Sequence, residues 1–254
     1  MADHEGQAAD AAVSEDGLLN GKVRLLQPRE GYRVAIDSVF LAAAVPAGPG
    51  DLVLDVGAGV GAASLCLGWR ERGCHVRGLE VQRDLVRLAA QNVALNGMTG
   101  RVEIMVGDLL RPPPRLAPGS FAHVMANPPF FPAGQAQRTA HPGKTAAHVE
   151  GEASLGDWIR FCLLMVRPKG TVTFIYRPER MEALLAEFRN RAADIAIFPL
   201  WPGGNKPASR IIVRARKGVE GPTRLLTGMV LHRPDGRFAE GAQKVLREGA
   251  GLLI

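Results

Sequence analysis

This 254-residue sequence is poor in cysteine and contains no long apolar run. Its three cysteines are scattered without a C-x-x-C pair, which argues against a disulfide framework and a cysteine zinc site. The six histidines form no H-x-x-x-H pair either, so we expect no metal. No apolar run reaches the roughly 18–20 residues that cross a bilayer, and the first residues carry no basic, apolar signal sequence. These absences predict a cytoplasmic globular protein without a membrane or metal partner.

Basic residues are missing from the start of the chain. Residues 1–20 contain five acidic residues and no lysine or arginine, and small residues dominate them, so we expect a disordered acidic leader. The rest of the chain holds 31 basic against 20 acidic residues, a net charge of +11. A basic folded domain favours a polyanionic partner such as a nucleic acid. The alternative is a solvated, arginine-rich surface.

Short apolar runs alternate with helical patterns from residue 52 onward, which predicts a doubly wound α/β fold. Its sheet should be mostly parallel and seven-stranded, with helices on both faces. The short loop 201–208 excludes a crossover helix between the last two strands, so one strand should be antiparallel. We expect one domain over 21–254, in which 222–254 is a C-terminal extension. The predicted strands cover residues 52–56, 75–80, 102–106, 121–126, 171–176, 194–200 and 210–215.

A glycine-rich segment connects the first predicted strand to a predicted helix over 61–72. It contains Gly57, Gly59 and Gly61, which permit a tight turn and a close approach of a ligand to the backbone. The G-x-G-x-G spacing differs from the G-x-G-x-x-G of dinucleotide binders. Asp55, two residues before the first glycine, would repel a pyrophosphate but suits an ammonium group. The segment therefore favours the amino-acid end of S-adenosylmethionine, with a plain helix-start turn as the alternative.

Acidic residues also stand at the ends of the next two predicted strands. Glu80 is placed to accept hydrogen bonds from both hydroxyls of a ribose. Asp108 is placed to accept one from an adenine amino group, with Leu109 packing on the ring. A single acidic residue is more often an ordinary surface group. Three of them at three successive strand ends predict a nucleoside site.

The sequence Asn127-Pro128-Pro129-Phe130 follows the apolar run 121–126 directly. Two prolines end a strand abruptly and hold the preceding residue extended. Asn127 is therefore presented at the carboxyl end of a strand, where open α/β sheets bind ligands. A side-chain amide, a rigid turn lined by acceptors and an aromatic ring are suited to gripping a planar group that carries an NH2.

Together these residues resemble the class I S-adenosylmethionine-dependent methyltransferases, and Asn-Pro-Pro-Phe resembles the catalytic motif of their amino-methyltransferases. Residues 31–42 are similar to the G-x-R-x-x-x-D-x-x-x-L-A segment of bacterial adenine-N6 methyltransferases that modify the adenosine beside the anticodon of a valine tRNA. The resemblance covers about residues 24–217. It implies a Rossmann-like methyltransferase domain, S-adenosylmethionine as cofactor, Asp37 in a cofactor lid, and methyl transfer to adenine N6 in tRNA.

The chemistry expected of this site is a transfer dominated by positioning. Asn127 should accept one hydrogen bond from the target amino group and the carbonyl of Pro128 the second, while Phe130 stacks on the base. The loop 131–153 is expected to be a flap over RNA or a solvated loop. A second group of basic residues follows later in the chain and comprises Lys206, Arg210, Arg214, Arg216 and Lys217. We expect these side chains either to contact RNA phosphates along one edge of the sheet or simply to face solvent.

Other functions stay open at this stage. The catalytic motif is shared with guanine-N2 methyltransferases that act on rRNA and with glutamine-N5 methyltransferases that act on proteins. The net charge of +11 favours RNA over a protein substrate. The glycine spacing argues against a nicotinamide-dependent oxidoreductase. The presence of the acidic strand-end residues and of Asn127 argues against a non-catalytic RNA-binding protein on the same scaffold.

Overall fold

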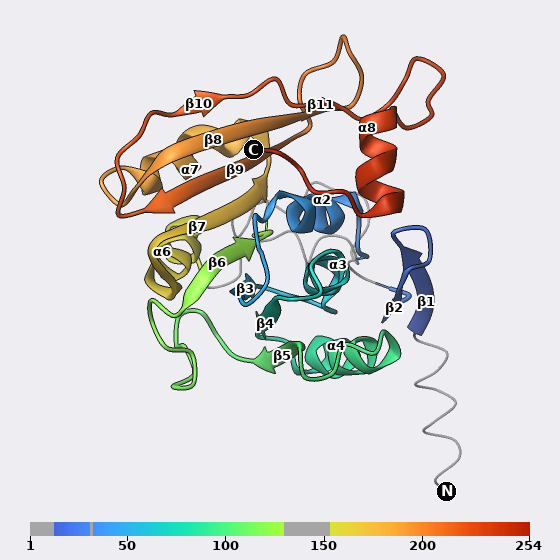
Figure 1. The fold of residues 1–254 in the computed structure, drawn as a ribbon, viewed down its shortest axis with the longest axis vertical. Coiled ribbons are helices and arrows are strands. Elements are labelled where there is room, and N and C mark those ends of the chain that lie inside the picture. Colours follow the sequence, from blue (N-terminus) through green and yellow to red (C-terminus); the bar gives the residue numbers. More distant parts are fainter. Residues whose placement is uncertain (1–12, 31–32, 130–152) are drawn as a thin grey trace, which may run out of the picture.

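The computed structural model describes residues 13–30, 33–129 and 153–254 (Figure 1). They form a central sheet with helices on both faces. Its strand order is β10-β8-β9-β7-β6-β3-β4-β5, and β11 also pairs with β8. The main strands are β3 (Leu52–Val56), β4 (His75–Glu80), β5 (Val102–Val106), β6 (Phe121–Ala126), β7 (Val166–Tyr176), β8 (Ala192–Trp201) and β9 (Arg210–Lys217).

The predicted mostly parallel sheet with one antiparallel strand is confirmed, although the sheet has nine strands in the described residues and not seven. Strand β9 lies between β7 and β8 and runs antiparallel to both, whereas the other pairings are parallel. The C-terminal extension, which the sequence predicts to hold a strand pair or an extended piece around residues 225–232, adds two short strands, β10 (Arg224–Leu225) and β11 (Met229–Val230). Both pair with β8 and run parallel to it.

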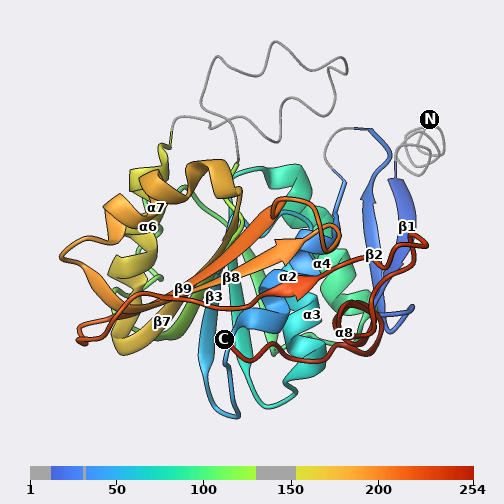
Figure 2. The same cartoon turned by 90° about the horizontal axis from the view of Figure 1, so that it is seen from above.

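Helices cover both faces of the sheet, as predicted for a doubly wound fold. Figure 2 shows α6 and α7 on one side and α2, α3 and α4 on the other. Each face has its own apolar cluster because alternate residues of each strand point to opposite faces. The helices are α2 (Ile36–Ala44), α3 (Ala62–Arg70), α4 (Arg83–Leu95), α6 (Leu155–Met165) and α7 (Met181–Phe188), the last preceded by a 3-10 turn over Pro178–Arg180.

The expectation of a disordered leader over residues 1–20 is wrong for its last part. Strands β1 (Val13–Leu18) and β2 (Val23–Pro28) form an antiparallel hairpin. The acidic side chains of this segment gain partners, because Glu15 pairs with Arg24 and Asp16 pairs with Arg33. Residues 1–12 lie outside the described part of the chain.

Two asparagines of α4 connect the hairpin to the body of the protein. Asn92 accepts a hydrogen bond from Leu26 N at 2.6 Å and donates one to Leu26 O at 2.9 Å. Asn96 does the same with the backbone of Arg24, at 2.8 and 2.7 Å. Val23 and Leu25, on the other side of β2, are fully buried in the core. The hairpin is therefore held by specific polar bonds as well as by apolar packing.

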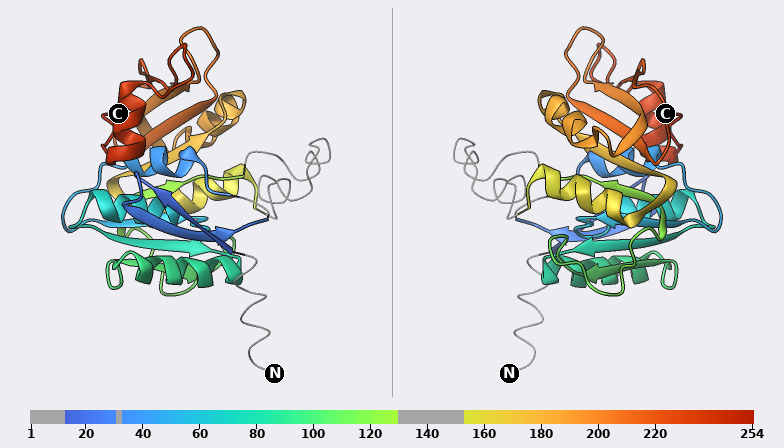
Figure 3. Two further views of the ribbon diagram at one scale, coloured as in Figure 1. Left: turned by 90° about the vertical axis from the view of Figure 1, so that its right-hand side faces the viewer. Right: turned by 90° about the vertical axis from the view of Figure 1, so that its left-hand side faces the viewer.

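The C-terminal extension folds back over the sheet. Figure 3 shows it, in red, at the end of the molecule opposite α4 and β5. It contains β10, β11, α8 (Glu240–Gln243) and a π-helical turn, Lys244–Glu248. Ala242 and Val245 are buried in the same apolar cluster as α2. The backbone of Leu252 donates a hydrogen bond to Ala43 O at 2.8 Å. The last residues thus close over α2.

Candidate active site

The turn after β6 presents a buried acceptor that has no partner. All six residues of β6 are buried, and Pro128 behind them is buried as well. The side-chain oxygen Oδ1 of Asn127 is buried without a hydrogen-bond partner in the described part of the chain. An unsatisfied buried polar atom costs about 1–3 kcal/mol, so a native protein that retains one usually has a use for it. Phe130 and residues 131–152 of the expected flap lie outside the described residues.

Tyr176, which the sequence analysis did not single out, supports this turn. Its side chain is fully buried at the end of β7, next to β6. Its hydroxyl donates a hydrogen bond to Pro129 O at 3.2 Å. The bond fixes the second proline of the turn from a neighbouring strand. The available signal was a tyrosine that ends an otherwise apolar strand, since a buried tyrosine hydroxyl usually needs a partner.

The glycine turn follows β3 at the same edge of the sheet. Gly57, Gly59 and Gly61 have φ angles of 73°, 57° and 87°, a region that favours glycine. A Cβ on Gly57 would lie 2.5 Å from a ring carbon of Trp158 on α6, so the indole packs directly against this turn. A Cβ on Gly59 would meet nothing within 4 Å. The turn is therefore packed at its first glycine and open at its second.

Glu80, at the end of β4, holds the glycine turn in place. Its Oε2 accepts a hydrogen bond from Gly59 N and its Oε1 accepts one from Gln82 N, both at 2.9 Å. Each carboxylate oxygen can accept a second hydrogen bond. The two bonds therefore orient Glu80 and leave it acceptor capacity for the hydroxyls that the sequence predicts there.

Asp55 is almost completely enclosed, with 2% of its surface exposed. Its Oδ2 accepts a hydrogen bond of 2.7 Å from Ser64 Oγ on α3. Burial raises the pKa of this carboxyl group to about 6, and the hydrogen bonds from Ser64, which lower the pKa, offset only part of this effect. The structure therefore brings Asp55 to the predicted edge but turns its carboxylate toward α3. This hydrogen bond joins the end of β3 to the first turn of α3.

Asp108 follows β5 at the outer end of the same edge. Its Oδ1 accepts a hydrogen bond from Leu110 N at 2.9 Å, and its Oδ2 lies 3.5 Å from the Arg111 guanidinium. Leu109 is partly buried and packs against the apolar cluster of the α6 face. The carboxylate of Asp108 remains partly exposed. Among the three acidic strand-end residues it is thus the most accessible to a ligand.

Asp37 lies in the first turn of α2, near the same edge of the sheet, because its partner Arg210 begins β9 next to Ile211, which pairs with Tyr176 at the carboxyl end of β7. It is 5% exposed, and its Oδ2 pairs with Arg210 Nε at 2.8 Å. This ion pair ties the start of α2 to the start of β9. Its place in a cofactor lid, implied by the resemblance, stays a prediction.

The basic residues of β9 do not form an outer edge, because β9 lies inside the sheet. Arg214 Nη1 donates to Ala44 O at 3.4 Å, and Lys217 Nζ donates to Val166 O at 3.0 Å. Arg216 pairs with Asp194 at 3.4 Å. The idea of a phosphate-contacting edge is therefore wrong for this strand. Lys206, in the loop before β9, is exposed as a whole residue, and the side chain of Arg216 is 42% exposed although it is paired.

Asn92 is a further residue that the sequence analysis missed. Besides its bonds to Leu26, its Nδ2 donates to Val60 O in the glycine turn at 3.0 Å. It thereby connects the hairpin to the turn. The signal was a polar residue on the buried face of a predicted helix, where an amide must find partners.

The glycine turn and the neighbouring strand ends offer room and polar groups for a nucleoside cofactor that carries an ammonium group. The open backbone at Gly59 leaves room for a ligand. Helix α3 begins at Ala62 without a side-chain cap from Gly61, and among the backbone N–H groups of its first turn that of Ser64 is engaged by Asp55. Glu80 and Asp108 supply acceptors at neighbouring strand ends. These features suit hydroxyl, amino and carboxylate groups held side by side, as in S-adenosylmethionine.

The described residues contain no group of three or more histidine, cysteine, aspartate or glutamate side chains that could hold a metal ion. Their helices are too short or too polar to span a membrane.

Comparison with known families gives a match over residues 32–144 to the model described as methyltransferase small domain. This segment includes the glycine turn, all three acidic strand-end residues and the Asn-Pro-Pro-Phe turn. The match thus coincides with the edge of the sheet at which the candidate residues converge.

Similar proteins come from several bacteria. A tRNA1(Val) (adenine(37)-N6)-methyltransferase of Vibrio campbellii is 22% identical over 86% of this chain and 88% of its own length. A ribosomal RNA small subunit methyltransferase C of Alcanivorax borkumensis is 32% identical over 51% of this chain and 34% of its own length. A solved structure described as a predicted O-methyltransferase from Agrobacterium tumefaciens superposes with a TM-score of 0.71 at 21% identity, covering 85% of this chain and 98% of that one. At that identity the last likeness supports the fold alone.

Proposed function

Because this chain belongs to the class I S-adenosylmethionine-dependent methyltransferases, we propose that it methylates the N6 amino group of an adenine in tRNA. The observation that carries the proposal is the unpartnered, buried Oδ1 of Asn127. An acceptor fixed at the carboxyl end of β6 requires a donor from a ligand, and an exocyclic NH2 is such a donor.

Asn127 and the proline turn would act by positioning. Asn127 Oδ1 accepts one N–H of the amino group, and the carbonyl of Pro128 accepts the other. Bonding both hydrogens in this way draws the nitrogen lone pair out of conjugation with the ring. S-adenosylmethionine, when bound, would supply an electrophilic methyl group that the nitrogen takes up as the carbon–sulfur bond breaks, and one proton of the amino group would leave to solvent. Tyr176 holds the turn still through Pro129, which favours transfer by orientation.

Phe130 would stack on the face of the target base. The base has to be unpaired or flipped out of its stack to reach the turn. Stacking on an aromatic ring contributes about 1–3 kcal/mol per base. This role rests on the sequence motif, because Phe130 is outside the described residues.

The cofactor residues follow from their places at the sheet edge. Glu80 would accept from the ribose hydroxyls, and Asp108 from the adenine amino group, with Leu109 against the ring. Gly57, Gly59 and Gly61 would let the backbone approach the amino-acid end. Asp55 would supply negative charge for the ammonium group. Asp37 would position the segment before α2 through its pair with Arg210.

RNA is the proposed partner for two reasons. The chain after residue 20 has a net charge of +11, and the similar Vibrio protein is named for a tRNA substrate. We accordingly propose a cytoplasmic location. The second candidate is guanine N2 in rRNA, which the likeness to the Alcanivorax protein favours. Glutamine N5 of a protein is the third, because that amide is also planar.

The test is mass spectrometry of nucleosides from tRNA and rRNA of cells that lack this protein. Loss of N6-methyladenosine from a tRNA, restored by the wild-type chain and not by Asn127→Ala, is the expected result. Loss of N2-methylguanosine from rRNA would instead establish the second candidate. Unchanged nucleosides in both RNA pools would overturn both RNA proposals.

A further inference from the structure

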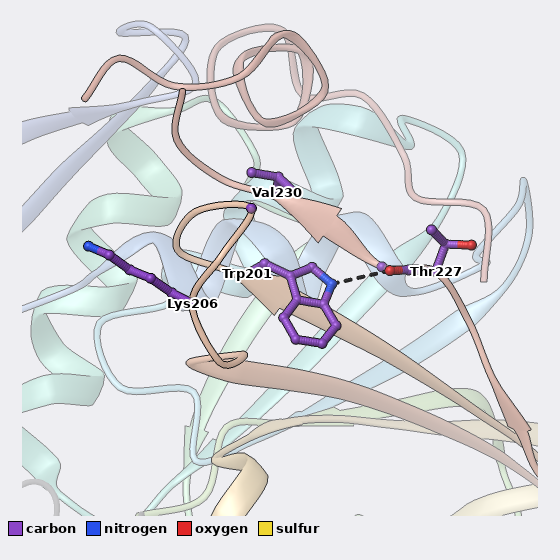
Figure 4. A pocket seen from close by; sticks show the side chains of 6 residues that line it. Trp201, Lys206, Thr227 and Val230 are labelled. Carbon is purple, nitrogen blue, oxygen red and sulfur yellow. Dashed lines mark hydrogen bonds between the residues drawn. The ribbon is translucent and has the colours of Figure 1, made fainter. Parts of the chain in front are cut away.

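A second candidate site lies at the same edge of the sheet, at the carboxyl end of β8. A pocket of about 250 Å³ opens there (Figure 4). Because β8 runs parallel to β6, its last residue points to the same edge as the Asn127 turn. The residues that line the pocket are Trp201, Gly204, Lys206, Thr227, Gly228 and Val230.

The indole of Trp201 is fixed in the wall of this pocket. Its Nε1 donates a hydrogen bond to Thr227 O at 3.2 Å. The backbone oxygen of Trp201 accepts one from Leu231 N at 2.7 Å, and Val230 is its partner in the pairing of β8 with β11. The side chain is only partly buried. A ring that is anchored at its polar end and open at its face loses little conformational freedom when a planar group stacks on it.

The loop after Trp201 leaves the pocket open. A Cβ added to Gly203 or Gly204 would meet no atom within 4 Å. Figure 4 shows Lys206 beyond the ring, on the side opposite Thr227. The loop therefore frames the pocket without filling it.

Lys206 differs from the basic residues of β9. It is exposed, and no described carboxylate lies within ion-pair distance of it. Arg216 and Lys217, by contrast, are bonded to other parts of the protein. Arg233, also exposed, follows His232, whose Nδ1 lies 3.1 Å from Pro202 O in the same loop. Lys206 is thus a positive charge in the lining of the pocket, and no described carboxylate pairs with it.

We propose that this pocket binds a nucleotide of the substrate RNA other than the target, with its base against Trp201 and its phosphate near Lys206. The proposal rests on the proposed function. Strands β6 and β8 are separated by two strands, so at about 4.8 Å per pairing the pocket is about 14 Å from the catalytic turn along the edge. That span corresponds to about four stacked nucleotides at 3.4 Å each, and to fewer in an extended strand.

The experiment measures methyl transfer to total tRNA by purified full-length protein. Trp201→Ala should raise KM for tRNA about 5- to 150-fold, the range expected for loss of one stacked base, with a smaller effect on kcat. Trp201→Phe, which keeps an aromatic face, should recover most of the affinity. Lys206→Ala should reduce the slope of log K against log salt by about 0.7, as for one lost contact to a single-strand phosphate.

A matched control exists at the opposite edge of the sheet. There Lys22 Nζ lies 4.8 Å from the centre of the Trp69 ring. Lys22→Ala and Trp69→Phe change the same residue types and should leave KM for tRNA unchanged. Tryptophan fluorescence adds a second readout, because tRNA should quench the wild type more than it quenches Trp201→Phe. Thermal unfolding and S-adenosylmethionine affinity show whether each variant is folded. If Trp201→Ala does not fold, Lys206→Glu at its exposed position carries the test.

The outcomes separate the two proposals. If the wild type methylates tRNA but the Trp201 and Lys206 variants match it in KM, salt slope and quenching, the pocket proposal is overturned and the proposed function stands. If the wild type methylates a glutamine-containing peptide and no RNA, the proposed function fails and the pocket proposal fails with it.

Discussion

The polar residues at the two ends of the buried strand β6 differ in their hydrogen bonding. Near its amino end, His123 has both ring nitrogens engaged, Nδ1 with Thr171 Oγ1 at 2.8 Å and Nε2 with Asp51 Oδ2 at 3.3 Å. Asp51 also pairs with Arg167 at 3.4 Å. At the carboxyl end, Asn127 Oδ1 has no partner in the described residues.

The difference shows which edge is organised for stability and which for binding. A satisfied network in a buried position stabilises one arrangement of the chain. A retained unsatisfied acceptor lowers stability and is useful only when a ligand completes it. The contrast therefore predicts that replacing His123 mainly alters stability, whereas replacing Asn127 mainly alters activity.

The largest expected effect comes from Asn127→Ala. It should lower kcat about 100- to 1,000-fold, the range seen when one preorganised hydrogen-bonding group is removed from an active site. The free energy of unfolding should not fall as it does for other buried polar residues, because the lost oxygen had no partner. Steady-state kinetics and urea unfolding measure the two quantities. Equal activity of variant and wild type would contradict the assignment of Asn127.

The next effect concerns two glycines with left-handed backbones, one at each edge. Gly57→Ala combines a φ of 73° with a Cβ 2.5 Å from the Trp158 ring, so it should cost about 2–5 kcal/mol of stability. Gly50, before β3, has a φ of 82° and nothing within 4 Å of its Cβ. Gly50→Ala should cost only the backbone strain, about 1–2 kcal/mol. Urea unfolding gives both values, and similar losses would show that the Trp158 contact is unimportant.

A third prediction uses the raised pKa of Asp55, about 6 against 3.8 for an unperturbed group. Between these values the folded state binds more protons than the unfolded state, so stability falls as pH rises. The two-unit shift corresponds to roughly 3 kcal/mol. Asp55→Asn keeps an acceptor for Ser64 and should remove this loss. Unfolding free energies of both proteins at pH 4 and pH 7 test the prediction, and parallel pH profiles would oppose it.

The smallest effect is expected at His123. Burial lowers the pKa of its imidazole below the usual 6.5, although the nearby Asp51 carboxylate acts in the opposite direction. Here the unfolded state binds the extra proton. The stability due to neutral His123 is therefore present above pH 6.5 and is lost as pH falls through the lowered pKa. His123→Gln should flatten this part of the profile and leave kcat intact. A loss of kcat comparable to that of Asn127→Ala would remove the contrast between the edges.

Local patterns were sufficient to predict the parts of the fold that depend on neighbouring residues. The seven main strands are buried apolar runs, and the turn at Gly57 requires glycine because of its own backbone angle. The Asn127 turn follows from two prolines. These elements carry their cause within a few residues of sequence, so periodicity and turn chemistry identify them.

The failures depend on contacts between distant residues. Strand β1 looked disordered because its acidic residues gain Arg24 and Arg33 only in the hairpin. The arginines of β9 were expected at an accessible edge because strand order is set by long-range pairing, and local sequence patterns do not reveal that β9 lies between β7 and β8. Tyr176 and Asn92 were missed because their partners are distant along the chain: Pro129 is 47 residues from Tyr176, and Val60 and Leu26 are 32 and 66 residues from Asn92.

The asparagine contacts of α4 have a consequence for how the protein avoids self-association. Four residues of a helix advance about 6.0 Å, and two residues of a strand advance about 6.6–6.8 Å. Asn92 and Asn96 can therefore follow the repeat of an adjoining strand and bond to alternate residues of β2. An open strand edge is a template on which other chains add and form aggregates. The two carboxamides occupy this edge of β2, so the helix protects the hairpin from intermolecular strand pairing.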